Sequence, residues 1–145
     1  MSRYLENAKI ALGAWARGND GTFGGSLSAN DLRPVFDRAM ELGLTLWDTA
    51  YVYGMGESEM TLGGFLRTVS RESYQISAKF TPQCASPRAE NAVIEMYRES
   101  AHLLGAEYMD YYWIHNPVCA PRWIKELIPL AKSGKIGING LGRHN

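Results

Sequence analysis

The sequence predicts an α/β fold in which parallel strands alternate with helices. Short apolar runs, polar loops and amphipathic stretches follow one another in that order, with glycine at the ends of amphipathic stretches, as in successive βα units. The apolar runs are hydrophobic or aromatic at odd and even positions alike, which is typical of strands covered on both faces. We therefore predict four complete βα units and a fifth strand within the 145 residues.

Five segments are the candidate strands of this sheet. Parallel strands joined by helices cross over with one hand, so the sheet either stays open and doubly wound or curls into a barrel. The periodicity does not choose between these two folds. A closed (β/α)₈ barrel takes about 250 residues, however, and four units fall near its midpoint. The predicted strands are Ile10–Leu12, Leu44–Asp48, Tyr74–Phe80, Tyr108–His115 and Ile136–Leu141.

The first helix is predicted over Asn30–Leu42. Its apolar residues recur at spacings of three and four and form one stripe, and the glycine that follows supplies a stop. Proline belongs in the opening turn of a helix, so Pro34 predicts a start at Asn30 or Asp31 and not at Ser28. The expected stripe is Leu32, Val35, Phe36, Ala39 and Met40.

Three further helices follow from capping and stop signals. We expect Ser58 to cap a short second helix, and Ser86 with Pro87 to open a longer third helix that ends at Gly105. Pro121 opens the fourth, which a glycine closes. The residues expected to face inward are Leu62, Phe65 and Leu66 in the second helix, Ala92, Val93, Met96, Leu103 and Leu104 in the third, and Trp123, Ile124, Leu127, Ile128 and Ala131 in the fourth.

Charge and hydropathy restrict the class of protein. Fifteen basic and fifteen acidic residues balance, and the basic residues are scattered among acidic neighbours, which argues against a nucleic-acid surface and favours a small-molecule partner. No run approaches the roughly 20 apolar residues of a membrane span, and the N-terminus has no apolar segment of the signal-peptide type. We therefore expect a soluble, cytoplasmic protein with no membrane partner.

The two cysteines indicate neither a disulfide nor a metal site, and the chain shows no boundary between domains. Cys84 and Cys119 have neither C-x-x-C spacing nor a nearby histidine cluster, so we expect two free thiols and no metal site. No linker or low-complexity segment divides the chain. Residues 1–145 are therefore expected to form a single domain.

Ionisable residues close three neighbouring strands. Asp48 ends the second predicted strand, Lys79 closes the run Gln-Ile-Ser-Ala-Lys of the third, and His115 ends the fourth, while Tyr53 follows Asp48 in the loop. In α/β folds the carboxyl ends of strands meet at one edge. The four side chains are therefore expected to converge there.

Together these groups can form a general acid. A tyrosine donates a proton poorly at neutral pH unless nearby positive charge favours its phenolate. Lys79 would supply that charge, and Asp48 would hold the ammonium in place. Taken singly, the residues have ordinary explanations, because Asp48 and Lys79 can be a structural ion pair, His115 a core or rim histidine and Tyr53 a loop residue that only packs.

The local sequence resembles a known family. The run 48–59, Asp-Thr-Ala-Tyr-Val-Tyr-Gly-Met-Gly-Glu-Ser-Glu, resembles the signature of the aldo-keto reductases, and the order Asp, Tyr, Lys, His matches their catalytic tetrad. Leu12-Gly-Ala-Trp is similar to the family's first strand, Ala78-Lys-Phe to its lysine strand, and the segment 108–117 to its histidine strand. The resemblance covers essentially the whole chain.

The resemblance implies a (β/α)₈ barrel that reduces aldehydes or ketones with NADPH, or catalyses the reverse oxidation, without a metal. Tyr53 would donate the proton to the carbonyl oxygen of a small substrate, Lys79 and Asp48 would tune it, and His115 would orient the carbonyl. Trp15, in the loop after the first strand, lines the substrate pocket or packs in the core, and both alternatives stay open.

The cofactor contacts depart from the family pattern. Asp48, Gly142 and Arg143 are the candidate NADP(H)-binding residues. Near the fifth strand the family commonly has Gly-x-Ser-Asn, whose serine and asparagine touch the nicotinamide amide, and here Gly142 and Arg143 stand at those two positions. The family binds the cofactor phosphates largely through loops after the seventh and eighth strands. The 145 residues of this sequence do not include those loops.

The chain is thus expected to be the N-terminal half of such a barrel, with the C-terminal half absent. A half-barrel exposes two strand edges and part of one sheet face, which invites pairing. Three origins are considered: a truncated product, a half-barrel that pairs with itself, and a partner of a separate second half. The alternative function is accordingly a non-catalytic binding or assembly subunit.

Overall fold

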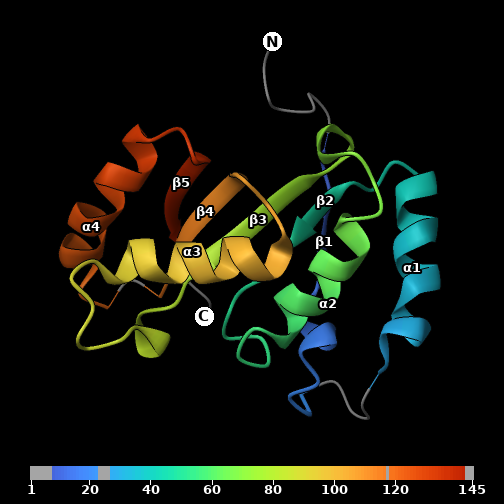
Figure 1. Cartoon of the computed structure of the whole chain (residues 1–145), viewed down its shortest axis with the longest axis horizontal. Coiled ribbons are helices and arrows are strands. Elements are labelled where there is room, and N and C mark those ends of the chain that lie inside the picture. The colour runs from blue at the N-terminus through green and yellow to red at the C-terminus, as the bar shows by residue number, and fades with distance from the viewer. Residues whose placement is uncertain (1–7, 23–26, 117, 143–145) are drawn as a thin grey trace.

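The computed structural model describes residues 8–22, 27–116 and 118–142, which contain one parallel sheet and four α-helices (Figure 1). In Figure 1, α3 lies across β3 and β4, α1 and α2 lie on the side of β1 and β2, and α4 lies beside β5. The strands are β1 (Ala11–Gly13), β2 (Leu46–Asp48), β3 (Gln75–Phe80), β4 (Met109–His115) and β5 (Ile136–Gly142), and the helices are α1 (Ala29–Glu41), α2 (Glu57–Leu66), α3 (Ala92–Leu104) and α4 (Ala120–Lys132).

The strand order decides between the two folds that the periodicity left open. Each strand pairs in parallel with the next one in the sequence, in the order β1-β2-β3-β4-β5. A doubly wound sheet reverses the direction of strand addition at a switch point. Here every strand is added on the same side, as in a (β/α)₈ barrel. The four predicted βα units and fifth strand are confirmed, and β1 and β5 are the open edges of the described sheet.

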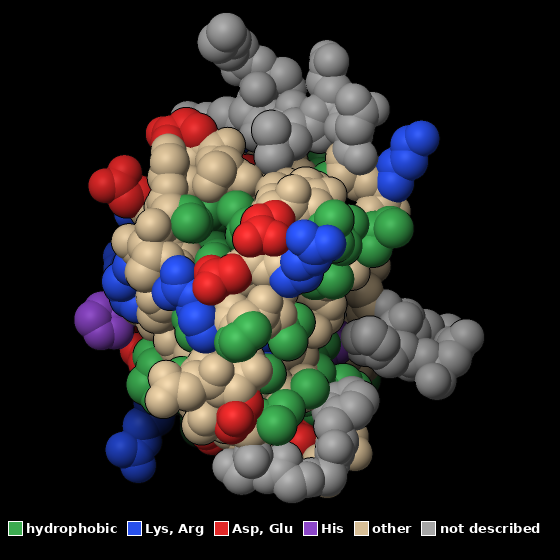
Figure 2. Space-filling view, turned by 90° about the vertical axis from the view of Figure 1, so that its right-hand side faces the viewer, with side chains coloured by type: hydrophobic (Ala, Val, Ile, Leu, Met, Phe, Trp, Pro, Cys, Tyr) green, Lys and Arg blue, Asp and Glu red, His purple; other side chains and the backbone are tan. Residues whose placement is uncertain are grey.

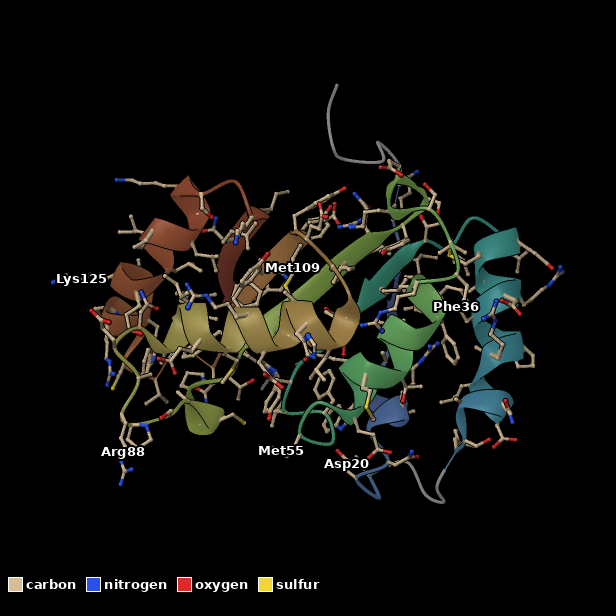
Figure 3. The ribbon with its side chains drawn as sticks, viewed as in Figure 1. Asp20, Phe36, Met55, Arg88, Met109 and Lys125 are labelled. Atoms are coloured by element: carbon tan, nitrogen blue, oxygen red, sulfur yellow. The ribbon has the colours of Figure 1, made fainter. Side chains whose placement is uncertain are left out.

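Aromatic side chains fasten the helices to one face of the sheet. Trp47 of β2 stacks on Phe36 of α1 with 5.1 Å between ring centres, and Phe36 lies 5.4 Å from Phe65 of α2. Phe36, labelled in Figure 3, lies between α1 and α2. Phe80 of β3 packs 5.0 Å from Trp123 of α4. Because such rings bury large apolar areas, this face forms the core, while the opposite face carries polar side chains such as Ser77 and Lys79 together with Tyr111 and Trp113.

The predicted start of α1 was wrong by one or two residues. The helix begins at Ala29, and Ser28 caps it: its hydroxyl accepts from the Asp31 N–H, and the Asp31 carboxylate accepts from the Ser28 N–H. This reciprocal cap satisfies two backbone donors at the helix start. Pro34 therefore lies in the second turn, where it removes one hydrogen bond of the helix.

Two other predicted caps were wrong. The N-cap of α2 is Gly56, whose φ of 96° suits glycine, whereas the Ser58 hydroxyl is buried inside the fold. The third helix begins at Ala92 and not at Ser86, because the Asn91 side chain caps it by accepting from the backbone N–H two residues after Ala92. Pro121 lies in the first turn of α4, as predicted.

Most side chains expected to face inward are buried or partly buried. Val35, Ile124 and Ile128 are instead 57%, 42% and 46% exposed, and Leu130, which was not predicted, is buried. In α4 the apolar stripe is wider than the surface it covers, so only the residues on its centre line, such as Trp123, reach the sheet.

The surface agrees with the balanced composition. On the side of the molecule that carries α1, acidic and basic side chains are interspersed with apolar ones among the residues drawn in colour (Figure 2). Within the described ranges, no helix combines the length and the apolar character needed to cross a bilayer. Cys84 and Cys119 are free thiols. The cytoplasmic location expected from the sequence stays a prediction.

A buried ion pair joins the amino ends of β3 and β4. The Asp110 carboxylate, 2% exposed, accepts from Arg71 at 2.7 Å and from the Ile76 N–H at 2.8 Å. Arg71 also donates to the carbonyls of Tyr74 and Tyr108. This network lies at the edge opposite to the strand ends that carry the candidate site, so we assign it to stability.

We predict that Asp110→Ala lowers the free energy of unfolding by about 3 kcal/mol, because it leaves the mostly buried Arg71 guanidinium without its carboxylate partner and the Ile76 N–H without its acceptor. Urea unfolding followed by circular dichroism measures the change. The matched control is Asp37→Ala, which breaks an exposed ion pair with Arg33 and should cost at most about 1 kcal/mol. Equal losses in the two variants would contradict the assignment.

Candidate active site

The structure brings the four candidate residues to one edge of the sheet. Asp48 ends β2, Lys79 is the penultimate residue of β3, His115 ends β4, and Tyr53 lies in the turn between β2 and α2. Asp20 and Met55, labelled in Figure 3, mark the loops that follow β1 and β2 at this same edge. The convergence expected from the strand ends is therefore present.

The Lys79 ammonium is the centre of the site. It is almost fully buried and donates to the Asp48 carboxylate at 2.6 Å, to the Thr49 carbonyl at 2.9 Å and to the Tyr53 hydroxyl oxygen at 3.2 Å. An ammonium has three N–H donors, so these acceptors use all of them. Its nitrogen also lies 4.9 Å from the centre of the Tyr53 ring. The phenol oxygen thus lies in direct contact with a fixed positive charge.

Two aromatic groups hold the Tyr53 ring. Trp15, in the 3₁₀ turn Trp15–Gly18, stacks on it with ring centres 5.1 Å apart and planes 8° apart. His115 meets it edge to face at 6.1 Å. Tyr53 is 6% exposed whereas Trp15 is 41% exposed, so Trp15 lies at the rim and not in the core. That position suits a pocket wall, a role that stays a prediction.

Close backbone contact fixes the turn that carries Tyr53. A side chain on Gly54 would place its Cβ 1.9 Å from the Gly18 carbonyl oxygen, and one on Gly18 would meet the Tyr53 carbonyl carbon at 2.6 Å. Gly54 also has a φ of 69°, which L side chains rarely adopt. The loop after β1 and the turn after β2 therefore cross at a point where only glycine fits. This backbone contact between Gly18 and Gly54 holds the neighbouring residue Tyr53 in place.

Ser58 reinforces the same arrangement. Its buried hydroxyl donates to the Ala14 carbonyl at 2.7 Å and shares a 3.0 Å hydrogen bond with the Thr49 hydroxyl. Ser58 therefore links the first turn of α2 to the ends of β1 and β2. The sequence offered no signal for this role, because serine near a helix start predicts a cap.

His115 is positioned by Thr81, the residue that follows β3, and by β5. Its Nδ1 and the Thr81 hydroxyl form a 3.3 Å hydrogen bond, and Gly142, the last residue of β5, pairs with His115 in the sheet. Gly142 therefore lies beside His115, and its role in binding the cofactor stays a prediction. The other cofactor candidate on this strand, Arg143, lies outside the described residues. Among the described residues, no group of three or more His, Cys, Asp or Glu side chains is placed to hold a metal ion.

A buried carboxyl lies behind the site. Glu59 of α2 is fully buried, and neither of its oxygens has a hydrogen-bond partner of normal geometry among the described residues. Burial raises the pKa of Glu59 to about 8, and the nearby Ser100 hydroxyl and Lys79 ammonium oppose that rise only in part. The group is therefore a neutral acid at neutral pH. The sequence showed Glu59 only as part of the run 48–59 and gave it no role.

Comparison with known proteins gives an independent line of evidence. The sequence model of the aldo/keto reductase family matches residues 9–145. This chain belongs to the aldo/keto reductase family. The resemblance based on the run 48–59 is therefore confirmed, and the half-barrel topology is that of the first part of an aldo/keto reductase.

Curated relatives and solved structures agree with the assignment. An uncharacterized oxidoreductase of Mycobacterium tuberculosis is 34% identical and aligns with 95% of this chain but 43% of its own length. The aldo-keto reductase YhdN of Bacillus subtilis is 27% identical over 91% of this chain and 39% of its own. The chain thus spans less than half the length of these two relatives.

Solved aldo/keto reductases share the fold. The Klebsiella pneumoniae enzyme, determined in complex with NADPH, has a TM-score of 0.76 at 23% identity and covers 94% of this chain and 45% of that one. A glycerol dehydrogenase from Gluconobacter oxydans has a TM-score of 0.72 at 27% identity and covers 92% and 44%. Both matches cover nearly all of the five-stranded unit, so its curvature and strand order are those of the family's barrel.

We predict that Glu59→Gln removes a pH dependence of stability. In the unfolded chain Glu59 ionises near its usual pKa of 4.5, whereas in the fold it keeps its proton to about pH 8. Wild-type stability relative to the variant is therefore highest below pH 4.5, falls between pH 4.5 and 8 by up to about 1.4 kcal/mol per pH unit, and levels off above pH 8.

Urea unfolding of both proteins at several pH values measures this difference. Glu95→Gln, at an exposed position of α3, is the matched control and should run parallel to wild type. A constant difference between wild type and Glu59→Gln across the range would show that the carboxyl ionises in the fold as it does in the unfolded chain.

Proposed function

We propose that the complete site transfers a proton from Tyr53 to the carbonyl oxygen of an aldehyde or ketone while NADPH is oxidised, or catalyses the reverse oxidation of an alcohol. The observation that carries this proposal is the contact of the buried Lys79 ammonium with the Tyr53 oxygen. Membership of an oxidoreductase family supports the reaction class.

The hydrogen-bond directions fit an acid. Lys79 can only donate, so the Tyr53 oxygen accepts from it and directs its own proton away from the lysine. When that proton leaves, the ammonium stabilises the negative charge on the phenol oxygen. Asp48 supports the charged lysine in a buried position. His115, which faces the Tyr53 ring, is proposed to orient the carbonyl.

The space beside two glycines at this edge of the sheet is open. A side chain on Gly13 would meet nothing within 4 Å, and one on Gly142 would make only ordinary contacts. Nicotinamide would supply the hydride, and Asp48 and Gly142, with Arg143 beyond the described residues, are the proposed contacts. Relatives solved with NADPH and with NADP support this choice, and the glycerol dehydrogenase relative supports the alcohol side of the reaction.

A second function is favoured by the open sheet. Ile138 of β5 pairs with Tyr111 of β4, is 44% exposed, and lies on the same face of the sheet as Trp113. Leu141 on this edge strand is 50% exposed. Exposed apolar side chains on an unpaired edge favour association. The alternative proposal is therefore an assembly subunit that pairs with a second copy or with a complementary half-barrel.

We predict that Tyr53→Phe lowers NADPH-dependent turnover of a carbonyl panel by about 10²- to 10⁴-fold, because the proton donor is lost. Loss of NADPH absorbance measures turnover, and fluorescence titration shows whether cofactor binding is unchanged. Tyr51→Phe, in the same turn, is the control and should retain activity. Equal activity of the two variants would refute the role of Tyr53, and a chain that binds no NADPH would favour the assembly function.

The assembly proposal predicts that the chain elutes at a multiple of its own mass in size-exclusion chromatography with light scattering. Ile138→Lys should return it to the mass of one chain, because a charge would then lie on the exposed sheet face. Val35→Lys, at a similarly exposed site on α1, is the control and should not change the mass. A single-chain mass for the unmodified protein excludes pairing with itself.

A further inference from the structure

A line of hydrogen bonds reaches Asp48 from the side opposite to Lys79. The Trp113 indole N–H donates to the Ser77 hydroxyl oxygen at 2.9 Å, and the Ser77 hydroxyl donates to Asp48 Oδ1 at 2.6 Å. The other carboxylate oxygen, Oδ2, accepts from Lys79 Nζ at 2.6 Å. The two oxygens of Asp48 are thus assigned to two different partners.

The strand register places these groups side by side. Asp48 pairs with Ser77 across β2 and β3, and Lys79 pairs with Trp113 across β3 and β4. Alternate residues of a strand share a face, so Ser77 and Lys79 both lie on the face that carries the site. The line from Trp113 to Asp48 therefore crosses three neighbouring strands on one face.

The indole ring is held in a single orientation. Tyr111, two residues earlier on the same face of β4, stacks on Trp113 with planes 8° apart and centres 6.2 Å apart. On β5 the residue paired with Trp113 is Gly140, where an added Cβ would lie 2.9 Å from the indole Cζ3. The ring fills the space that this glycine leaves, and its N–H points toward β3.

The chemistry of the indole gives the line a direction. An indole N–H donates and cannot accept, whereas a serine hydroxyl can do either. Because Trp113 donates into the Ser77 oxygen, the Ser77 proton is directed to the remaining acceptor, Asp48 Oδ1. Without the indole, the hydroxyl is no longer constrained to donate to the carboxylate.

We propose that Trp113 is a positioning residue of the site, which acts through Ser77 to fix the Asp48 carboxylate so that Oδ2 alone faces Lys79. The proposal rests on the proposed role of Lys79 beside Tyr53. It assigns to Trp113 an effect on the ammonium of Lys79, the residue that pairs with Trp113 on β3, beyond the packing that the indole ring provides.

The hydrogen-bond line is tested in the full chain by nuclear magnetic resonance of the four tryptophan indole groups. The Trp113 signal is identified by its loss in Trp113→Phe. Ser77→Ala and Asp48→Asn should shift this signal and speed its exchange with solvent by roughly tenfold or more, whereas Ser77→Thr, which keeps a hydroxyl, should preserve it. Trp123, whose indole donates to the Val118 carbonyl, is the internal reference and should not change.

The effect on Lys79 is tested by its acylation with an amine-specific reagent, quantified by peptide mass spectrometry. Trp113→Phe and Ser77→Ala should each increase acylation of Lys79, while Ser77→Thr restores the wild-type rate. The proposal is overturned if neither Ser77→Ala nor Asp48→Asn changes the position or the exchange rate of the Trp113 indole signal. It is also overturned if Trp113→Phe leaves the acylation of Lys79 unchanged. Neither readout needs turnover, so failure of this proposal is distinct from failure of the proposed reduction.

Discussion

The buried Lys79 ammonium is the constraint on which the site depends. Removing an ammonium from water costs several kcal/mol unless hydrogen-bonded acceptors replace the water. All three acceptors come from β2 and the turn after it, while the lysine comes from β3. A shift of one residue between these strands would turn Lys79 toward the helices and leave its charge unpaired. The register between β2 and β3 therefore determines both whether the Lys79 charge is paired and whether the site has its observed geometry.

The positions of Asp48, Lys79 and His115 could be predicted because strand ends are local features of the sequence. A short apolar run that closes with a polar residue shows both the strand and the edge at which it ends. Tyr53 required one more step, since it lies in a loop and its placement depends on contacts with Trp15 and with the crossing of Gly18 and Gly54, which are remote in sequence.

Other features could not be predicted, because the same residue type serves different purposes in different surroundings. Ser58 resembles a cap in sequence, yet its hydroxyl bonds to the Ala14 carbonyl, and glycine occupies the cap position instead. Ser77 appears in sequence as an ordinary strand residue until the register places it between Asp48 and Trp113. Such roles depend on contacts between side chains that are distant in sequence, and a single sequence does not show which of these contacts form.

The contacts of Tyr53, the proposed proton donor, come from neighbouring βα units of the chain. Lys79 meets Asp48 and Tyr53 at sequence separations of 31 and 26 residues, and the supports of Tyr53 come from the turn after β1 and from β4. The proposed cofactor contacts, in contrast, begin only at the end of β5 with Gly142. Tyr53 and the Lys79 ammonium thus depend on adjacent βα units and on their shared register. Closure of a barrel is not needed to bring the ammonium, carboxylate and phenol together.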